Sequence, residues 1–117
     1  MIKRVFVLVA ILTISFEAFG DSYYRNRTIV GAGIYYSGNI SILLFGIDGD
    51  KSGMVPCASS GRFTINSNAP HYKEIVSLVL TAYASKQNTV DLYVTESCNY
   101  FGNAQDVLGV KMGDIPW

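Results

Sequence analysis

The sequence predicts a small, mainly β domain with one helix, on three observations. β-branched and aromatic residues dominate two neighbouring segments, Thr28 to Tyr36 and Ile40 to Ile47, as they do in strands. Apolar residues then recur at three- and four-residue steps from Ala69 to Ser85, which is the pattern of one helix face. From Val90 to Thr95 apolar and polar residues alternate, and a period of two is that of a strand. The expected fold class is therefore mainly β (α+β).

The first hairpin is the clearest of the predicted elements. Ser37-Gly38-Asn39 separates the two β-rich segments, and these residue types favour a turn. Gly31 and Gly33 lie inside the first strand, where glycines commonly mark a bulge or a sharp bend. A third strand is expected from Val55 to Ile65, interrupted by Ser59-Ser60-Gly61.

The helix is expected to begin near Asn68, whose side chain can cap it, with Pro70 tolerated in the first turn. After it, the strand Val90 to Thr95 should have one face in water, and a last strand is expected from Asp106 to Met112. The predicted apolar face of the helix consists of Tyr72, Ile75, Val76, Val79, Leu80 and Tyr83.

The predicted order is three strands, one helix and two strands. A small five-stranded antiparallel barrel with one helix between strands three and four, the OB-fold, has this order. Other small α+β folds share it, so the order by itself does not decide the topology.

The first 20 residues have the pattern of a cleaved secretory signal. Lys3 and Arg4 precede an apolar run from Val5 to Phe16, and Ala18-Phe19-Gly20 offers small residues at a cleavage site. The run is short against the ~20 residues of a membrane-spanning helix. We therefore expect residues 1–20 to be removed and residues 21–117 to form a single exported domain, periplasmic or secreted, without membrane attachment.

Two cysteines, Cys57 and Cys98, remain in the mature chain. An even number of cysteines in an oxidising compartment favours a disulfide, expected to stabilise by about 3–4 kcal/mol. Two separate thiols or part of a metal site are the alternatives. His71 is the only histidine, so a closed zinc site lacks ligands, and neither a metal nor a cofactor is predicted.

The charge balance argues against some classes of partner. The whole chain has nine basic and nine acidic residues and a formal net charge of zero. Binding to nucleic acid or to an anionic membrane surface needs a basic excess or patch. Nucleic acid is therefore not an expected partner.

The stretch from Asp48 to Gly53 resembles the first half of a calcium loop, because Asp48, Asp50 and Ser52 alternate. Position twelve of such a loop requires a bidentate glutamate, but Ser59 stands there. The flanking segments are also predicted strands instead of helices. A loop between two strands is the favoured interpretation.

The stretch Tyr72 to Val94 resembles the B subunits of subtilase-cytotoxin-like and pertussis-like toxins. Those subunits have an OB-fold in which a helix with an aromatic end leads into a strand through a Gln-x-Val step. Tyr83, Gln87 and Val90 match this pattern, although Asn88-Thr89 lengthens the step by one residue. The resemblance implies a glycan-binding homo-oligomer, a pentamer if the protein is toxin-like.

The chain is also similar to a group of small secreted gammaproteobacterial proteins. These have a signal, a cysteine before a "YK…LLTAY" helix and a second cysteine after the next strand. Tyr72-Lys73, Leu80 to Tyr83, Cys57 and Cys98 match this pattern. The group has no established activity to carry over to this chain.

No motif points to catalysis. His71 lies at the start of the helix without a G-x-S-x-G element or another nucleophile signature, and the carboxylates are scattered over the elements. We expect His71 to be an exposed first-turn residue and assign no catalytic residues, so the protein is predicted not to be an enzyme.

Tyrosines are the more informative residues, since rigid rings with a hydroxyl group suit sugars and protein interfaces. Tyr35 and Tyr36 point to opposite faces of one strand, and Ser37 and Asn39 add hydrogen-bonding groups beside them. Together with Tyr100 they are the candidate ligand-binding residues. The expected function is a non-catalytic module that binds a glycan or protein partner. The alternative is a periplasmic structural or inhibitory protein that docks to a larger protein.

Overall fold

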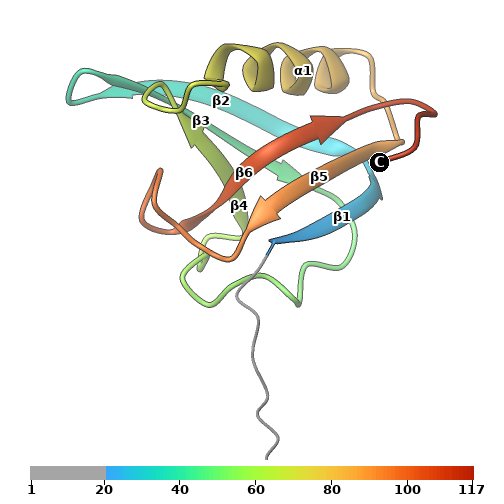
Figure 1. Cartoon of the computed structure of the whole chain (residues 1–117), viewed down its shortest axis with the longest axis horizontal. Helices are drawn as coiled ribbons and strands as arrows, with labels where there is room; N and C mark the ends of the chain where they lie inside the picture. The colour runs from blue at the N-terminus through green and yellow to red at the C-terminus, as the bar shows by residue number, and fades with distance from the viewer. Residues whose placement is uncertain (1–20) are drawn as a thin grey trace, which may run out of the picture.

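The computed structural model describes residues 21–117, so the predicted signal lies outside the described residues. The described chain forms six strands and one helix (Figure 1). In chain order these are β1 (Asp21–Arg27), β2 (Ile29–Ser37), β3 (Ile40–Ile47), β4 (Arg62–Asn66), α1 (Tyr72–Ala84), β5 (Val90–Thr95) and β6 (Ala104–Lys111). The predicted mainly β class with one helix is confirmed.

The six strands form one sheet in the order β1-β5-β6-β4-β3-β2. Neighbouring strands are antiparallel except β4 and β6, which are parallel. β1 and β2 lie at the two ends of this order, although only Thr28 separates them in the chain. The sheet therefore curves strongly, and α1 lies along one side of it (Figure 1).

Two features of the predicted topology differ from the structure. There are six strands instead of five, and the helix follows the fourth strand instead of the third. The sheet is also not closed, because β1 and β2 do not pair with each other within residues 21–117. The segment of β1 has a polar composition because only one of its faces meets the core, through Tyr24, whereas Tyr23 and Arg25 are exposed.

The predicted hairpin is confirmed, with β2 and β3 paired antiparallel from Ser37↔Ile40 to Ile29↔Ile47. Gly38 and Asn39 have positive φ in its turn, which glycine and asparagine tolerate best. The register shifts between Ile29 and Gly31, so the bulge predicted from the glycines is also present. The third predicted strand is shorter than expected, since only Arg62–Asn66 is extended.

The helix spans Tyr72–Ala84, and its N-cap residue is His71 instead of Asn68, with no side-chain cap. Its buried residues are Ile75, Val79 and Ala82. Leu80 and Tyr83, which were expected in the apolar face, are exposed. Ala82, which was not expected in the apolar face, is buried instead.

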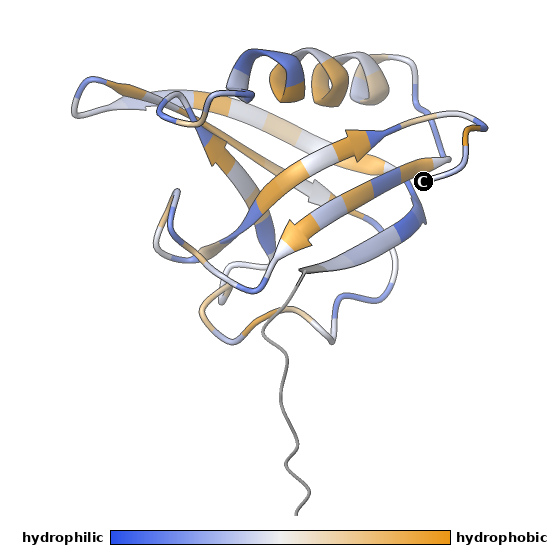
Figure 2. Ribbon diagram, in the orientation of Figure 1, coloured by the Kyte–Doolittle hydropathy of each residue, from blue (hydrophilic) through white to orange (hydrophobic). Residues whose placement is uncertain are grey.

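The core lies between the inner face of the curved sheet and α1. Hydrophobic residues alternate with more hydrophilic ones along β5, as the colour bands in Figure 2 show. The largest fully buried apolar side chains are Phe45, Phe63, Leu43, Ile47, Ile65 and Leu92. On the face of β5 that was predicted to lie in water, Asp91 is buried and Tyr93 and Thr95 are half-buried, so that prediction is wrong at Asp91.

Candidate functional site

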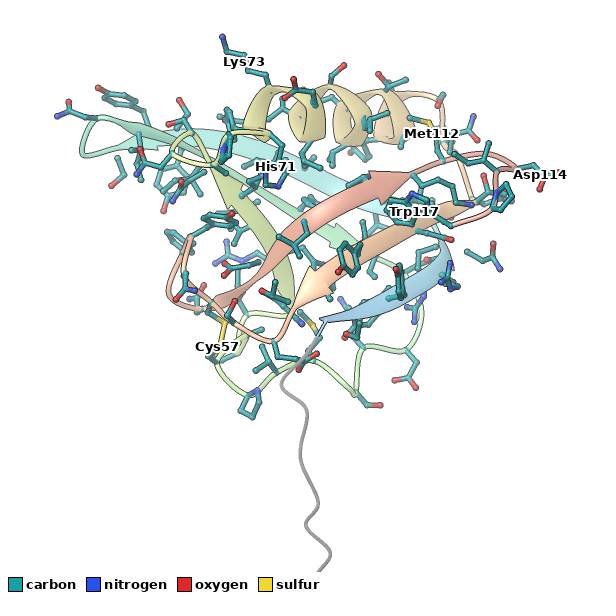
Figure 3. The ribbon with its side chains drawn as sticks, viewed as in Figure 1. Cys57, His71, Lys73, Met112, Asp114 and Trp117 are labelled. Atoms are coloured by element: carbon teal, nitrogen blue, oxygen red, sulfur yellow. A yellow bond between two sulfur atoms is a disulfide. The ribbon has the colours of Figure 1, made fainter. Side chains whose placement is uncertain are left out.

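The predicted disulfide between Cys57 and Cys98 is confirmed, with the two Cα atoms 6.2 Å apart. It joins the long β3–β4 loop to the loop that follows β5. Figure 3 shows Cys57 at the end of the molecule opposite α1. The bond therefore ties the β5–β6 loop, which carries Phe101, to the body of the domain.

Four of the five predicted ligand-binding residues lie together on the β2–β3 hairpin. Tyr35, Tyr36, Ser37 and Asn39 are all exposed, and the Tyr36 hydroxyl donates a hydrogen bond to Asn39 Oδ1 at 3.2 Å. The tip of this hairpin extends past the N-terminal end of α1 (Figure 1). It is therefore a projecting surface with two rings on opposite faces of the strand.

Tyr100, the fifth predicted residue, lies in the β5–β6 loop and packs partly against the core. Burial, with the Asp106 carboxylate nearby, raises its pKa. The ring that does meet Tyr35 is that of the next residue, Phe101, edge to face at a centroid distance of 5.9 Å. Phe101 was not predicted as a site residue, and only the tertiary structure places it there.

A groove of about 450 Å³ runs along the outer face of β2 and β3, beside Tyr35. Its floor is rich in glycine, because Gly31 pairs with Gly46 and Gly33, opposite Leu44, is the next residue on the same face. A Cβ atom added at Gly31 or Gly33 would have no atom within 4 Å. The groove is lined by Val30, Gly31, Ala32, Gly33, Ile34, Tyr35, Leu44, Phe45, Gly46 and Arg62.

Arg62 brings a fixed positive charge to this groove. Its Nε donates to Ser60 Oγ and its Nη2 to Asn103 Oδ1, both at 2.9 Å. The guanidinium carbon lies 5.6 Å from the centroid of the Phe101 ring, a cation–π distance. Within residues 21–117 its Nη1 has no hydrogen-bond partner, so this nitrogen can donate to a ligand.

The loop that carries Phe101 is held in place by the buried carboxylate of Asp106. That carboxylate accepts hydrogen bonds from Ser97 Oγ at 2.7 Å, Asn99 N at 2.8 Å and Tyr100 N at 2.9 Å. Asn66 Nδ2 also donates to the carbonyl oxygen of Tyr100 at 3.1 Å. The loop that carries Phe101, and with it the ring that packs against Tyr35 and Arg62, is therefore held in a fixed position.

A second aromatic cluster covers the outer face of β1, β5 and β6. The Tyr23 and Tyr93 rings stack at 5.0 Å, and the Trp117 ring meets Tyr23 edge to face at 6.0 Å. Trp117 lies over the glycine at position 109, where an added Cβ would come within 3.0 Å of the indole. Figure 3 shows Trp117 lying across this face of the sheet.

Beneath this cluster lies the buried carboxylate of Asp91. It accepts a hydrogen bond from Arg25 Nη1 at 3.0 Å and from Asn26 N at 2.9 Å, and Lys111 Nζ lies 3.4 Å away. Burial alone raises the pKa of Asp91, but the Asn26 N–H, the Arg25 guanidinium and the Lys111 charge outweigh it, so the pKa lies below its usual value.

His71 is not an exposed residue, and this prediction is wrong. The residue is half-buried at the N-terminal end of α1, and its Nε2 is buried without a hydrogen-bond partner within the described chain. Figure 3 shows its side chain on the side of the helix that faces the sheet. No group of three or more histidine, cysteine, aspartate or glutamate residues within 21–117 could hold a metal ion.

The Asp48 to Gly53 stretch lies in the loop between β3 and β4, as predicted. Its oxygens already have donors in the chain: Thr28 N donates to Asp48 Oδ1, and Ser52 N donates to Asp50 Oδ1, both at 2.8 Å. Arg27 donates to the carbonyl oxygens of Asp48 and Asp50. The hydrogen bonds from Ser52, helped by the charge of Arg27, lower the pKa of Asp50.

Comparisons with known proteins do not assign the chain to a family. No protein-family model and no curated protein matches it. Over residues 21–117, no helix is long and apolar enough to cross a membrane. The geometry of the groove is therefore the basis for a functional proposal.

Proposed function

We propose that the protein is an exported, non-catalytic binding module that holds a carbohydrate in the groove beside Tyr35. The observation that carries this proposal is the combination in one groove of a glycine-rich floor, the Tyr35 ring and a fixed arginine, with Phe101 packed against both Tyr35 and Arg62. Sugar rings have apolar C–H faces that pack on aromatic rings and hydroxyl edges that need hydrogen bonds. Arg62 Nη1 can supply such a bond.

We further propose that the domain is an OB-like barrel in which β1 and β2 are the two halves of one bent first strand. The single residue between them and their places at the two ends of the sheet support this. Counted so, the helix follows the third strand. OB-folds bind saccharides on the face of their second and third strands and on nearby loops. In this count those strands are β3 and β4, and both contribute residues to the groove.

Export is part of the same proposal. The signal pattern of residues 1–20 and the disulfide between Cys57 and Cys98 are both compatible with an oxidising compartment. On the toxin analogy, five copies would also assemble into a ring, which native mass measurement checks.

A glycan array probed with the mature protein tests the sugar-binding proposal. We expect a signal that falls about tenfold or more in Tyr35→Ala, because the ring face is lost. The matched control is Tyr23→Ala, which removes an exposed tyrosine from the other aromatic cluster and should retain the signal. No signal for the wild type on any glycan, or equal loss in both variants, would refute the proposal.

The alternative is a periplasmic structural or inhibitory protein that acts by docking to a larger protein. The exposed apolar side chains on β2 (Val30, Ile34, Tyr35 and Tyr36) favour it. Capture of one defined envelope protein by the wild type but not by Ile34→Lys, together with an empty glycan array, would support docking over sugar binding.

A further inference from the structure

Arg62 is the one charged residue among those of the described chain that line the groove beside Tyr35. The other lining residues are glycines or have apolar or aromatic side chains, and none of them carries a carboxylate. The Arg62 Nε and Nη2 atoms donate hydrogen bonds to Ser60 and Asn103. Both acceptors are neutral, so these bonds orient the guanidinium group without compensating its charge.

The other two arginines of the described chain each act on a carboxylate. Arg25 Nη1 lies 3.0 Å from Asp91 Oδ2, and the charge of Arg27 helps to lower the pKa of Asp50. No ion pair within residues 21–117 includes Arg62. The groove therefore contains a positive charge that the described chain itself leaves without a negative partner.

The groups next to Arg62 do not neutralise it. The Phe101 ring lies 5.6 Å from the guanidinium carbon and attracts the cation, but the ring has no net charge. Asp106 lies on β6, the strand that pairs with β4, and its two carboxylate oxygens accept hydrogen bonds from the β5–β6 loop. An anion that pairs with Arg62 would therefore come from a bound molecule.

A ligand in the groove displaces water from this charge. Moving a charge out of water is costly unless hydrogen bonds or an opposite charge compensate it. A sugar hydroxyl offers Arg62 Nη1 a neutral acceptor, whereas a carboxylate or sulfate oxygen offers an acceptor and the opposite charge. Hydrogen bonds between charged groups are about twice as strong as those between neutral groups. The groove should therefore bind an anionic sugar more tightly than the neutral sugar of the same shape.

We propose that the carbohydrate bound in the groove carries an anionic group, a carboxylate or a sulfate, and that Arg62 selects it. The anionic oxygen accepts a hydrogen bond from Arg62 Nη1, while the Tyr35 ring packs on the C–H face of the same sugar. The inference rests on the proposed function, because it names the class of sugar that this groove takes. The whole chain has a formal net charge of zero, so the selection comes from one residue and not from a general attraction of anions.

An array of oligosaccharides in matched sets tests this inference with the mature protein. Each set holds one sugar in four forms: the neutral sugar, its uronic acid, the methyl ester of that acid, and its sulfate. We expect the uronic acid or the sulfate to bind about tenfold or more tightly than the neutral form. The methyl ester should bind as the neutral sugar does, because it has no charge. The stronger of the two anionic signals distinguishes a carboxylate from a sulfate.

Substitutions at Arg62 separate its charge from its other contacts. Arg62→Gln should remove the preference for the anionic forms and retain the signal of the neutral sugar, whereas Arg62→Lys should retain part of the preference. Lys73→Gln is the matched control, since it removes one positive charge from an exposed side chain of α1 that points away from the sheet (Figure 3). The control should keep the full preference. Circular dichroism checks that all three variants are folded.

Three outcomes would overturn the inference: equal binding of the neutral and anionic forms by the wild type, a preference that survives in Arg62→Gln, or a folded Arg62→Gln that also loses the neutral sugar. The last result would mean that Arg62 shapes the groove instead of selecting a charge. Neutral sugars bound without any preference would refute this inference alone. No signal for any member of the array would refute the proposed function, and this inference with it.

Discussion

The two outer faces of the sheet use the same residue types and differ in what lies on them. On the β1-β5-β6 face, Trp117 covers Gly109, and Tyr23 and Tyr93 pack beside it. On the β2-β3 face, Gly31 and Gly33 are bare, and the nearest ring, Tyr35, leans on Phe101 at the side. One glycine site is filled by the chain itself and the other is left open.

The aromatic residues of the covered face have a structural role, whereas we propose a binding role for those of the open face. Trp117 also accepts a hydrogen bond on its carbonyl oxygen from Arg25 Nη2 at 3.3 Å, and Arg25 in turn contacts Asp91, so the covered face is one connected network. On the open face, nothing in the described chain lies within 4 Å of a Cβ added at Gly31 or Gly33. In the proposed function, a carbohydrate occupies this groove.

The largest effect is expected at Asp91, under the covered face. Asp91→Ala removes the carboxylate beside Lys111 Nζ, whose side chain is 9% exposed. That buried charge then keeps only the carbonyl oxygen of Gly113, at 2.9 Å, as its acceptor among the described residues. We expect a loss of about 3–5 kcal/mol in the free energy of unfolding, measured by urea denaturation. Asp114→Ala, at an exposed carboxylate, is the control and should change stability little. A similarly small loss of stability in Asp91→Ala and Asp114→Ala would show that the contacts of Asp91 do not stabilise the covered face.

The same carboxylate predicts a pH dependence. The pKa of Asp91 is lower in the folded protein than in the unfolded chain, so its contribution is complete above the unfolded value of about 4. It should be lost as pH falls through that value and then through the lower folded pKa. Urea denaturation of the wild type and Asp91→Asn between about pH 6 and pH 2 checks this, and the two stability curves should converge at the acid end.

The disulfide should affect the open face more than the covered face. Cys98 shares the β5–β6 loop with Phe101, so Cys57→Ser with Cys98→Ser should loosen the wall of the groove and lower stability by about 3 kcal/mol. Hydrogen exchange is expected to accelerate at residues 97–103 before it does in β5. Uniform acceleration over both regions would contradict this separation.

The smallest effects on stability are expected when one glycine of each face is replaced by alanine, and this pair of variants compares the two faces directly. Gly109→Ala places a Cβ 3.0 Å from the Trp117 ring, so the indole must move, and we expect a loss of about 1–3 kcal/mol. Gly33→Ala meets open space and should leave stability unchanged or raise it by about 0.5 kcal/mol. Because Trp117 is the only tryptophan, its emission should shift in the first variant alone. Equal effects would mean that the two faces do not differ in packing.

The elements governed by short-range chemistry were predicted well. The hairpin with its Gly38-Asn39 turn and the β5 strand agree with the alternation and turn residues of the sequence. β1 was missed because its polar side chains hide a strand that buries mainly Tyr24. The predicted apolar face of the helix included two exposed residues, Leu80 and Tyr83, because local periodicity does not say which side of the helix meets the sheet.

By itself the sequence determined the mainly β class, the single helix, the cysteine pairing and the tyrosine-rich hairpin, because these follow from local periodicity, residue type and count. Only the tertiary structure decided that Phe101 and Arg62 join Tyr35, that Asp91 is buried between Arg25 and Lys111, and that Trp117 covers one glycine while Gly31 and Gly33 stay bare. Each of these contacts joins residues far apart in the chain, and strand order and register bring them together. That long-range pairing is what no local pattern specifies.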